Sequence, residues 1–230
     1  MRRVVAAAWQ ARYRIEVESE LRFSALAQRL ADAQMPAELV DRARTASSDE
    51  TRHAAECVQY VKRYAPDAEL PPPPPKAREF APGFLNPLQR LTYEMVTTCC
   101  VAETHSATNL VALFNAGPPE PLLSSLQALS RDEVTHGQLG WAFLEVARTR
   151  LSLDFLVPLL GGMLAADAGQ ALMTPANPDE DDPVLLQHGV LPHSARRELF
   201  TATLNEVIYP GFERAGVSTT DARAWVQERL

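Results

Sequence analysis

A proline-rich stretch in the first half of the chain limits what this sequence can fold into. Pro66, the five-proline run Pro71–Pro75, Pro82 and Pro87 separate segments whose apolar residues recur at helical intervals. Polyproline has no internal hydrogen bonds and cannot continue an α-helix. We therefore predict an extended crossover over residues 65–86, with helices before and after it.

Four long helices are predicted around this crossover. Their apolar residues follow the helical period, and strand-like alternation is absent. The connections within the first pair and within the second pair are short, so each pair is expected to form an antiparallel hairpin. Two hairpins joined by one long crossover are typical of a four-helix bundle. The predicted helices cover residues 3–34, 36–64, 87–115 and 120–149.

The pattern changes after Arg150. The expected fold is all-α, with a four-helix bundle over residues 1–150 and a helical C-terminal extension over 151–230 that packs on it. The shorter helices of the extension are predicted near 153–173, 194–208 and 219–229, with the acidic loop Asn177–Asp182 and Pro210-Gly211 between them.

Charge and cysteine content narrow the class of protein. A formal net charge of −7 argues against non-specific binding to nucleic acid or to an anionic membrane, since both need a basic surface. The 3 cysteines form neither a Cys-x-x-Cys motif nor an even-numbered disulfide framework. Apolar segments are too short for a signal peptide or a bilayer span. We expect a soluble, cytoplasmic protein with reduced thiols.

One motif occurs twice, on the second and fourth predicted helices. Asp49-Glu50-Thr51-Arg52-His53 and Asp132-Glu133-Val134-Thr135-His136 share the pattern Asp-Glu-x-x-His at an offset of 83 residues. A Glu and a His three positions apart lie on one face of a helix. The same offset relates Glu20 on the first helix to Glu103 on the third. Each hairpin thus repeats one arrangement of a glutamate and an Asp-Glu-x-x-His.

Together the two hairpins would bring four carboxylates and two imidazoles to the middle of a bundle. The predicted metal ligands are Glu20, Glu50, His53, Glu103, Glu133 and His136. Glu50 and Glu133 are expected to bridge two metal ions, and each remaining ligand is expected to bind one of them. Glu16, one turn before Glu20 on the same face, is the alternative ligand on the first helix.

The negative charge of these residues favours the binding of metal ions. Four buried, ionised glutamates are too costly without compensation, and two divalent cations cancel their charge. A donor set rich in oxygen with two imidazoles suits iron or manganese better than a structural zinc site, which prefers thiolates. Asp49 and Asp132 are expected to hydrogen-bond the ligands, because a ligating histidine usually donates its second ring N–H to a carboxylate or carbonyl.

The motif set over residues 1–150 resembles the ferritin-like superfamily of di-iron carboxylate proteins. The Asp before each Glu-x-x-His is similar to the small subunits of bacterial multicomponent monooxygenases and ribonucleotide reductases. The resemblance implies two iron ions, or a manganese/iron pair, that react with O₂. The chain departs from some arylamine N-oxygenases, which carry a third histidine where Leu129 stands, and from multicomponent monooxygenases, which carry a threonine in place of Ala107.

Other residues near the ligands are candidates for lining a substrate pocket. Core packing is the competing interpretation for the tyrosines and cysteines among them. His105, His188 and His193 are predicted to be packing or surface histidines. The candidate pocket residues are Tyr13, Glu16, Cys57, Tyr60, Cys99, Cys100 and Ala107.

Three functions are consistent with this pattern. The first is an oxidase or oxygenase that uses O₂ to oxidise a small organic molecule and receives electrons from a separate donor, because no flavin or nicotinamide motif is present. The second is an iron-handling protein that oxidises ferrous iron. The third is a metal-binding bundle without turnover. A homodimer is one candidate assembly.

Overall fold

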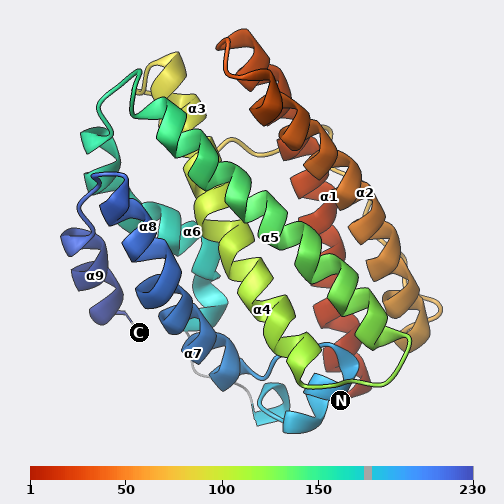
Figure 1. Ribbon diagram of the computed structural model, residues 1–230. Helices are drawn as coiled ribbons and strands as arrows, with labels where there is room; N and C mark the ends of the chain where they lie inside the picture. The colour runs from red at the N-terminus through yellow and green to blue at the C-terminus, as the bar shows by residue number, and fades with distance from the viewer. Residues whose placement is uncertain (174–177, 230) are drawn as a thin grey trace. The chain divides into compact units, whose positions relative to one another are not determined.

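The computed structural model describes the backbone of residues 1–173 and 178–229, and it describes the side chains of these residues except those of 168–178. Over the described residues the chain is all-helical and contains no strand (Figure 1). The all-α prediction is therefore confirmed for the described chain, while the ferritin-like arrangement of the hairpins stays a prediction. None of the described helices combines the length and apolar character needed to cross a bilayer. In chain order the elements are α1 (Arg2–Asp32), α2 (Ala37–Tyr64), α3 (Pro87–Met95), the π-helix η1 (Val96–Glu103), α4 (Thr104–Asn115), α5 (Leu122–Ala147), the 3₁₀ helix η2 (Asp154–Leu159), α6 (Leu160–Met173), the 3₁₀ helices η3 (Pro178–Glu180) and η4 (Pro183–His188), α7 (His193–Thr203), the π-helix η5 (Leu204–Ile208), α8 (Tyr209–Arg214) and α9 (Thr220–Gln227).

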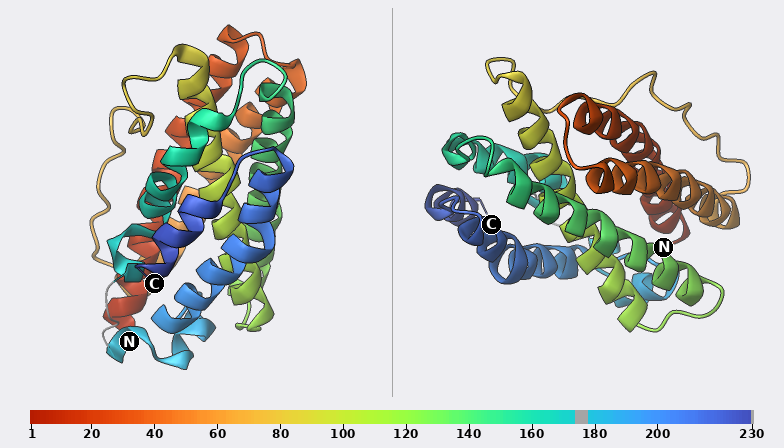
Figure 2. Two further views of the ribbon diagram at one scale, coloured as in Figure 1. Left: turned by 90° about the vertical axis from the view of Figure 1, so that its left-hand side faces the viewer. Right: turned by 45° about the horizontal axis from the view of Figure 1, so that its top comes forward.

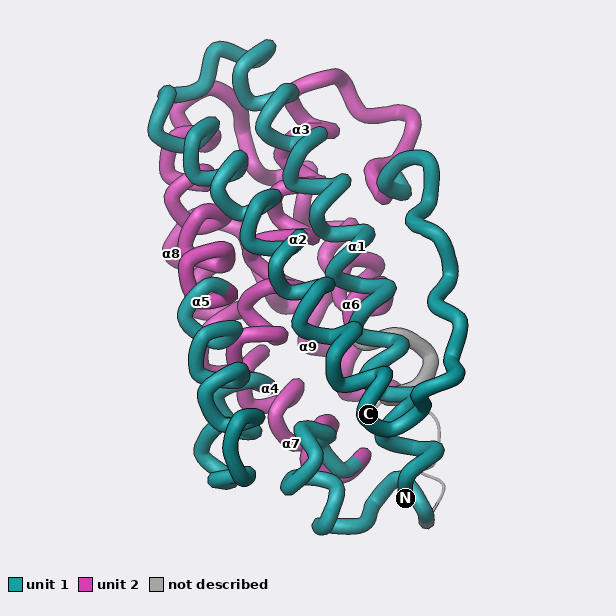
Figure 3. The backbone as a smooth tube through the Cα atoms, turned by 90° about the vertical axis from the view of Figure 1, so that its right-hand side faces the viewer, with its two compact units in different colours: residues 1–79, 110–132, 177–192 teal, residues 80–109, 133–176, 193–230 magenta. Residues whose placement is uncertain are grey.

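The chain divides into two compact units, each built from separate stretches of sequence (Figure 3). Unit 1 comprises residues 1–79, 110–132 and 177–192. Unit 2 comprises residues 80–109, 133–176 and 193–230. The domain boundary predicted at residue 150 lies inside unit 2, and α5 begins in unit 1 and ends in unit 2.

The hairpin of α1 and α2 forms most of unit 1. The two helices pack along each other, and the turn between them is short because Gln34 adopts a left-handed conformation with φ 51°. The Met35 N–H then donates to the Leu30 carbonyl at 3.0 Å, which satisfies the end of α1. Pro36 follows and directly precedes α2, a position where its missing N–H costs nothing.

The proline-rich crossover contains no helix, as Figure 2 shows for the thin trace that follows α2. Within unit 1 its last residues are bound to α1. The buried Arg22 donates to the Arg78 carbonyl at 2.8 Å, and Arg29 pairs with Glu79 at 2.7 Å. Its first residues are held by Lys62 of α2, which donates to the Ala68 carbonyl at 2.7 Å. Side chains of the helices thus supply hydrogen bonds that an extended proline segment cannot make internally.

Unit 2 begins with a helix start that the local sequence specifies. Asn86 accepts from the Gln89 N–H, and the Gln89 side chain accepts from the Asn86 N–H, so the two form a capping box with Pro87 in the first turn. Glu94 lies near the C-terminal end of α3 and is buried. Its carboxylate accepts hydrogen bonds from the backbone N–H groups of Phe80 and Ala81 at 2.6 and 2.7 Å. The end of the crossover is thereby fastened to α3.

The third predicted helix is continuous, but its centre is a π-helix. Residues 87–115 run through α3, η1 and α4 without a break, as predicted. Thr104, the first residue of α4, donates from its hydroxyl to the carbonyl of Cys99 in η1, five residues earlier, at 3.3 Å. A π-helix holds more residues in each turn than an α-helix, so residues after it are rotated relative to an α-helical count. Glu103 is the last residue of this segment.

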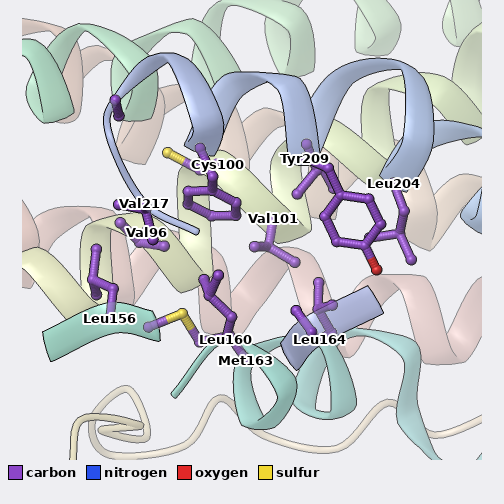
Figure 4. Packing of buried hydrophobic residues seen from close by; sticks show 14 of the residues in the cluster. Val96, Cys100, Val101, Leu156, Leu160, Met163, Leu164, Leu204, Tyr209 and Val217 are labelled. Atoms are coloured by element: carbon purple, nitrogen blue, oxygen red, sulfur yellow. The ribbon is translucent and has the colours of Figure 1, made fainter. Parts of the chain in front are cut away.

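The C-terminal helices share a core with α3 and η1 in unit 2 (Figure 4). Val96, Cys100 and Val101 of η1 pack in one buried cluster with Leu160 of α6 and Tyr209 of α8. The C-terminal helices therefore belong to the core of this unit rather than forming a separate body.

One predicted break does not occur. Pro210-Gly211 was expected to separate two helices, yet α7, η5 and α8 run continuously from His193 to Arg214. The π-helix immediately before Pro210 explains the difference, because its wider turn relieves the clash and the lost hydrogen bond that proline causes in a regular α-helix. Gly211 is needed where the chain meets Trp141, whose ring atoms would lie 2.5 Å from an added Cβ. Asn177 of the predicted acidic loop lies outside the described residues.

Candidate metal-binding triads

Unit 1 contains a buried group of one histidine and two glutamates, here called the unit 1 triad. Glu16 comes from α1, and Glu50 and His53 come from α2. Each residue offers a ligand atom within 4.8 Å of the others, and Glu50 and His53 are fully buried. The His53 Nδ1 atom lies 3.3 Å from a Glu50 oxygen and 3.8 Å from a Glu16 oxygen. The three side chains converge on one point.

The second ring nitrogen of His53 is held by an ionic network in the same unit. Its Nε2 atom lies 3.2 Å from Asp132 Oδ2, and Arg52 donates to Asp132 at 2.8 Å and to Asp49 at 2.9 Å. Burial by itself raises the pKa of Asp132, but the hydrogen bonds from Arg52 and His53 outweigh it and lower that pKa below the ordinary value. An ionised Asp132 accepts the Nε2 proton, so Nδ1 is the atom presented to the two glutamates.

Unit 2 contains a matching group, the unit 2 triad. Glu103 comes from the end of η1, and Glu133 and His136 come from α5. Their ligand atoms also lie within 4.8 Å of one another, and all three residues are buried. The His136 Nδ1 atom lies 3.6 Å from a Glu133 oxygen. Both triads therefore combine a Glu-x-x-His pair on one helix with a glutamate on a neighbouring helix.

Two glycines of α5 lie against the segment of η1 and α4 that surrounds Glu103. A Cβ added at Gly140 would lie 2.6 Å from Cys99 Cβ and 2.8 Å from the Cys100 backbone nitrogen. At Gly137, the residue after His136, it would lie 3.1 Å from the Thr104 hydroxyl. At Gly140 only glycine permits this spacing, because the added Cβ would come within 3.0 Å of the η1 backbone. The close approach places Glu103 beside the α5 ligands.

The charge of each triad calls for a cation. Two ionised carboxylates with a neutral imidazole carry −2, and removing such groups from water without compensation is costly. One divalent cation at each triad cancels that charge. Carboxylates and imidazole are both common metal ligands in proteins. The buried Glu/His groups could therefore hold metal.

On α1 the structure places Glu16, and not the predicted Glu20, in the triad. Glu16 is 6% exposed, whereas Glu20 is partly exposed and belongs to neither triad. The two residues share a helix face but lie one turn apart, about 5.4 Å along the axis. The 83-residue offset selected Glu20 on the assumption that the two hairpins are exact repeats. They are not, because η1 is a π-helix and α1 has no such segment.

The cysteines among the candidate pocket residues behave as small apolar side chains. Cys57, Cys99 and Cys100 are all fully buried and free of disulfides. Burial, with a further contribution from the Glu16 charge, raises the pKa of Cys57 far above its ordinary value, and burial likewise raises that of Cys100. The Cys57 and Cys100 thiols therefore stay protonated near neutral pH, and all three buried cysteines pack against their neighbours.

The other candidate pocket residues differ in their surroundings. Tyr60 is buried, stacks on Trp9 with ring centroids 4.4 Å apart, and hydrogen-bonds Ser125 at 2.8 Å. Ala107 is buried one turn after Glu103, and Tyr13 is partly exposed. Packing accounts for Tyr60, and nothing in the structure distinguishes Tyr13 as a pocket residue.

Sequence reasoning missed two groups. Arg52, which holds Asp132 and Asp49 together, sits inside the motif but was not recognised as functional. His105 is buried, as the packing alternative predicted, but its pairing with Asp167 of α6, whose carboxylate lies 2.9 Å from His105 Nδ1, was not foreseen. The partner Asp167 is far away in sequence, so no local signal could have revealed the pair.

No family model matches the chain, and no curated protein or solved structure matches it either.

Proposed function

We propose that the two triads bind a pair of iron ions and that the protein uses this pair to activate O₂ and oxidise a small organic molecule. One observation carries the proposal: each unit buries the same set of two carboxylates and one imidazole, of which one copy of the Asp-Glu-x-x-His motif contributes a glutamate and the histidine. A repeated, buried, anionic donor set has no use in a structural core, where paired or apolar groups are less costly.

The proposed ligand assignment follows the two motifs. Glu16 with Glu50 and His53 would hold one ion in unit 1, and Glu103 with Glu133 and His136 would hold one ion in unit 2. Asp132 hydrogen-bonds His53 within unit 1. The expectation from the sequence that Glu50 and Glu133 are shared by the two ions stays a prediction.

The residues around the proposed centre orient its ligands and exclude water. Asp132 holds the proton on His53 Nε2, which leaves Nδ1 as the ligating atom and fixes the ring plane. Arg52 keeps Asp132 ionised and in place by pairing with it. Full burial of Glu50 and His53 keeps bulk water from the reacting atoms. When bound, the iron pair would supply the electrons and the binding site for O₂ reduction. A separate redox partner would return those electrons.

Metal loading of the full chain tests the first part of the proposal. The metal-free protein is supplied with ferrous iron under nitrogen, and bound iron is counted per chain after gel filtration. Two ions are expected for the wild type, and Glu50→Gln and Glu133→Gln are each expected to lose the pair. Glu38→Gln and Glu145→Gln are matched controls, since they change exposed glutamates on the same two helices. Full loading of both triad variants would refute the bridging assignment.

Exposure of the loaded protein to O₂ tests the second part. An oxidase or oxygenase should consume O₂ repeatedly when a chemical reductant and a substrate library are present, with iron staying at two per chain. Accumulation of ferric iron well beyond two per chain would instead indicate an iron-handling protein. Stable ferrous protein that does not react with O₂ would contradict the proposed activity while leaving the metal site intact.

A further inference from the structure

The proline-rich crossover of unit 1 is a surface that the metal-binding triads do not involve. Every residue from Pro72 to Lys76 is exposed, whereas Pro71 and Ala77 on either side are half-buried. Among the described residues, none forms a hydrogen bond or an ion pair with residues 69–77. A proline has no N–H to donate but keeps its carbonyl as an acceptor. The exposed run therefore offers apolar rings and unused acceptors to the solvent.

The sequence itself fixes the conformation of this run. Each proline ring holds φ at about −65°, and a residue that precedes a proline is restricted to extended values of ψ. Residues 70–74 each precede a proline, so all of them favour the polyproline II helix. The structure agrees, because residues 68–74 contain no helix, turn or strand.

Both ends of the run are fixed to helices of unit 1. On the N-terminal side Lys62 of α2 donates to the carbonyls of Pro66 and Ala68 at 3.2 and 2.7 Å. On the C-terminal side Arg22 of α1 donates to the Arg78 carbonyl at 2.8 Å. The proline helix is therefore held in place before any partner arrives, and little conformational entropy is lost when a partner binds it.

The exposed part is long enough to be recognised. A polyproline II helix has about three residues per turn and rises ~3.1 Å per residue, so four prolines cover more than one full turn. We call the exposed residues Pro72–Lys76 the proline ridge.

We propose that the proline ridge is the docking site for a partner domain whose groove is lined by tryptophan and tyrosine side chains. Such grooves bind a preformed polyproline II helix, because aromatic rings pack on proline rings while indole and phenol groups donate to the carbonyls. The ridge supplies both features, since its rings are exposed and its carbonyls accept no hydrogen bond from the described residues.

The charges beside the ridge define a further property of this partner. Asp67 and Glu69 precede the run and are exposed, and the exposed Lys76 ends it. Carboxylates beside the groove are attracted by Lys76 and repelled by the two acidic residues. The groove of the partner therefore carries its acidic residues at the end that meets Lys76, which also sets the direction in which the ridge lies in it.

This inference goes beyond the proposed metal function and does not depend on it. The proline ridge contains no residue of either triad, and the contact with the partner requires no metal. Failure of metal loading leaves the docking proposal standing, and failure of docking leaves the metal proposal standing.

The test is a titration of the full chain into an isotope-labelled WW domain, followed by NMR. The probe is a purified module with an aromatic proline-binding groove, chosen with acidic residues beside that groove. A synthetic peptide covering residues 66–79 serves as a reference for the same sequence without the fold. The full chain should bind at least as tightly as the peptide, because its ridge is exposed and already extended. Weaker binding by the chain than by the peptide, or binding by neither, overturns the proposal.

One proline substitution locates the contact. Pro73→Ala removes a ring from the middle of the ridge and should weaken binding of the probe about five-fold or more, because the groove then buries less apolar area. Pro66→Ala removes an exposed proline of the same crossover outside the ridge, so it is the matched control and should bind like the wild type.

One charge substitution tests the orientation. Lys76→Gln should weaken binding about two- to five-fold at low salt, and the difference should disappear at high salt, because an exposed ion pair is screened. Arg14→Gln removes an exposed positive charge elsewhere in unit 1 and should bind like the wild type. If Pro73→Ala and Lys76→Gln both bind the probe as the wild type does, the contact lies elsewhere and the proposal is wrong.

Discussion

Gly140 lies so close to η1 that a single added methyl group tests what holds the unit 2 triad together. In Gly140→Ala the new Cβ would lie 2.6 Å from Cys99 Cβ and 2.8 Å from the Cys100 backbone nitrogen, and real Cβ atoms essentially never approach below 3.0 Å. One contact is to backbone, so no rotamer change can relieve it. The α5 helix must therefore move away from η1.

The size of the effect follows from two opposing terms. Alanine gains roughly 0.5–1 kcal/mol over glycine inside a helix. Overpacking a well-packed core costs about 1–3 kcal/mol. Gly162→Ala on α6 is the matched control, because Gly162 is exposed and has no atom within 4 Å of an added Cβ. Both variants share the propensity gain, so Gly140→Ala should be less stable than Gly162→Ala by about 1–3 kcal/mol.

Urea denaturation followed by far-ultraviolet circular dichroism measures this difference. In a thermal scan, each kcal/mol corresponds to roughly 2–4 °C for a chain of this size. The displaced α5 should also separate Glu133 from Glu103, so metal binding at the unit 2 triad should weaken in Gly140→Ala and not in Gly162→Ala. Equal stability of the two variants would refute the claim that glycine is required for this helix contact.

Three further predictions concern the remaining groups. Asp132→Asn should lower metal affinity about 10–100-fold, because the histidine of the unit 1 triad loses its carboxylate partner. Equilibrium dialysis measures the affinity, and Asp41→Asn, which changes an exposed aspartate, is the control. Hydrogen bonds from Thr219 and Arg223 lower the pKa of Glu213, so its contribution to stability is present above the unfolded pKa of about 4.3 and is lost as pH falls through the lower folded pKa. An NMR titration should find the Glu213 midpoint below that reference and find it raised in Arg223→Gln, and an unchanged midpoint would contradict the assigned cause. The three buried thiols should resist iodoacetamide until the chain unfolds, and mass spectrometry showing rapid native labelling would disprove their burial.

The helices could be predicted because their signals are local. The capping box at Asn86 and Gln89 and the proline at position 87 define the start of the third helix, and Gly117-Pro118 follows its end. The Glu-x-x-His spacing likewise fixes which residues share a helix face. Such signals depend only on residues that are close together in the sequence, so one amino-acid sequence is enough to predict these features.

The remaining features depend on contacts between helices. A sequence pattern gives the face on which Glu16 and Glu20 lie but not which turn of α1 is level with Glu50. The π-helix η1 has no distinctive composition, so the sequence did not indicate it. For the same reason the pairing of His105 with Asp167 required the tertiary structure.

The most direct test of the central claim is a crystal structure of the iron-loaded chain with anomalous difference maps at the iron edge. The account predicts one strong peak between Glu16, Glu50 and His53 and a second between Glu103, Glu133 and His136. Maps without a peak at either triad, from crystals of protein grown and loaded with iron, would contradict it.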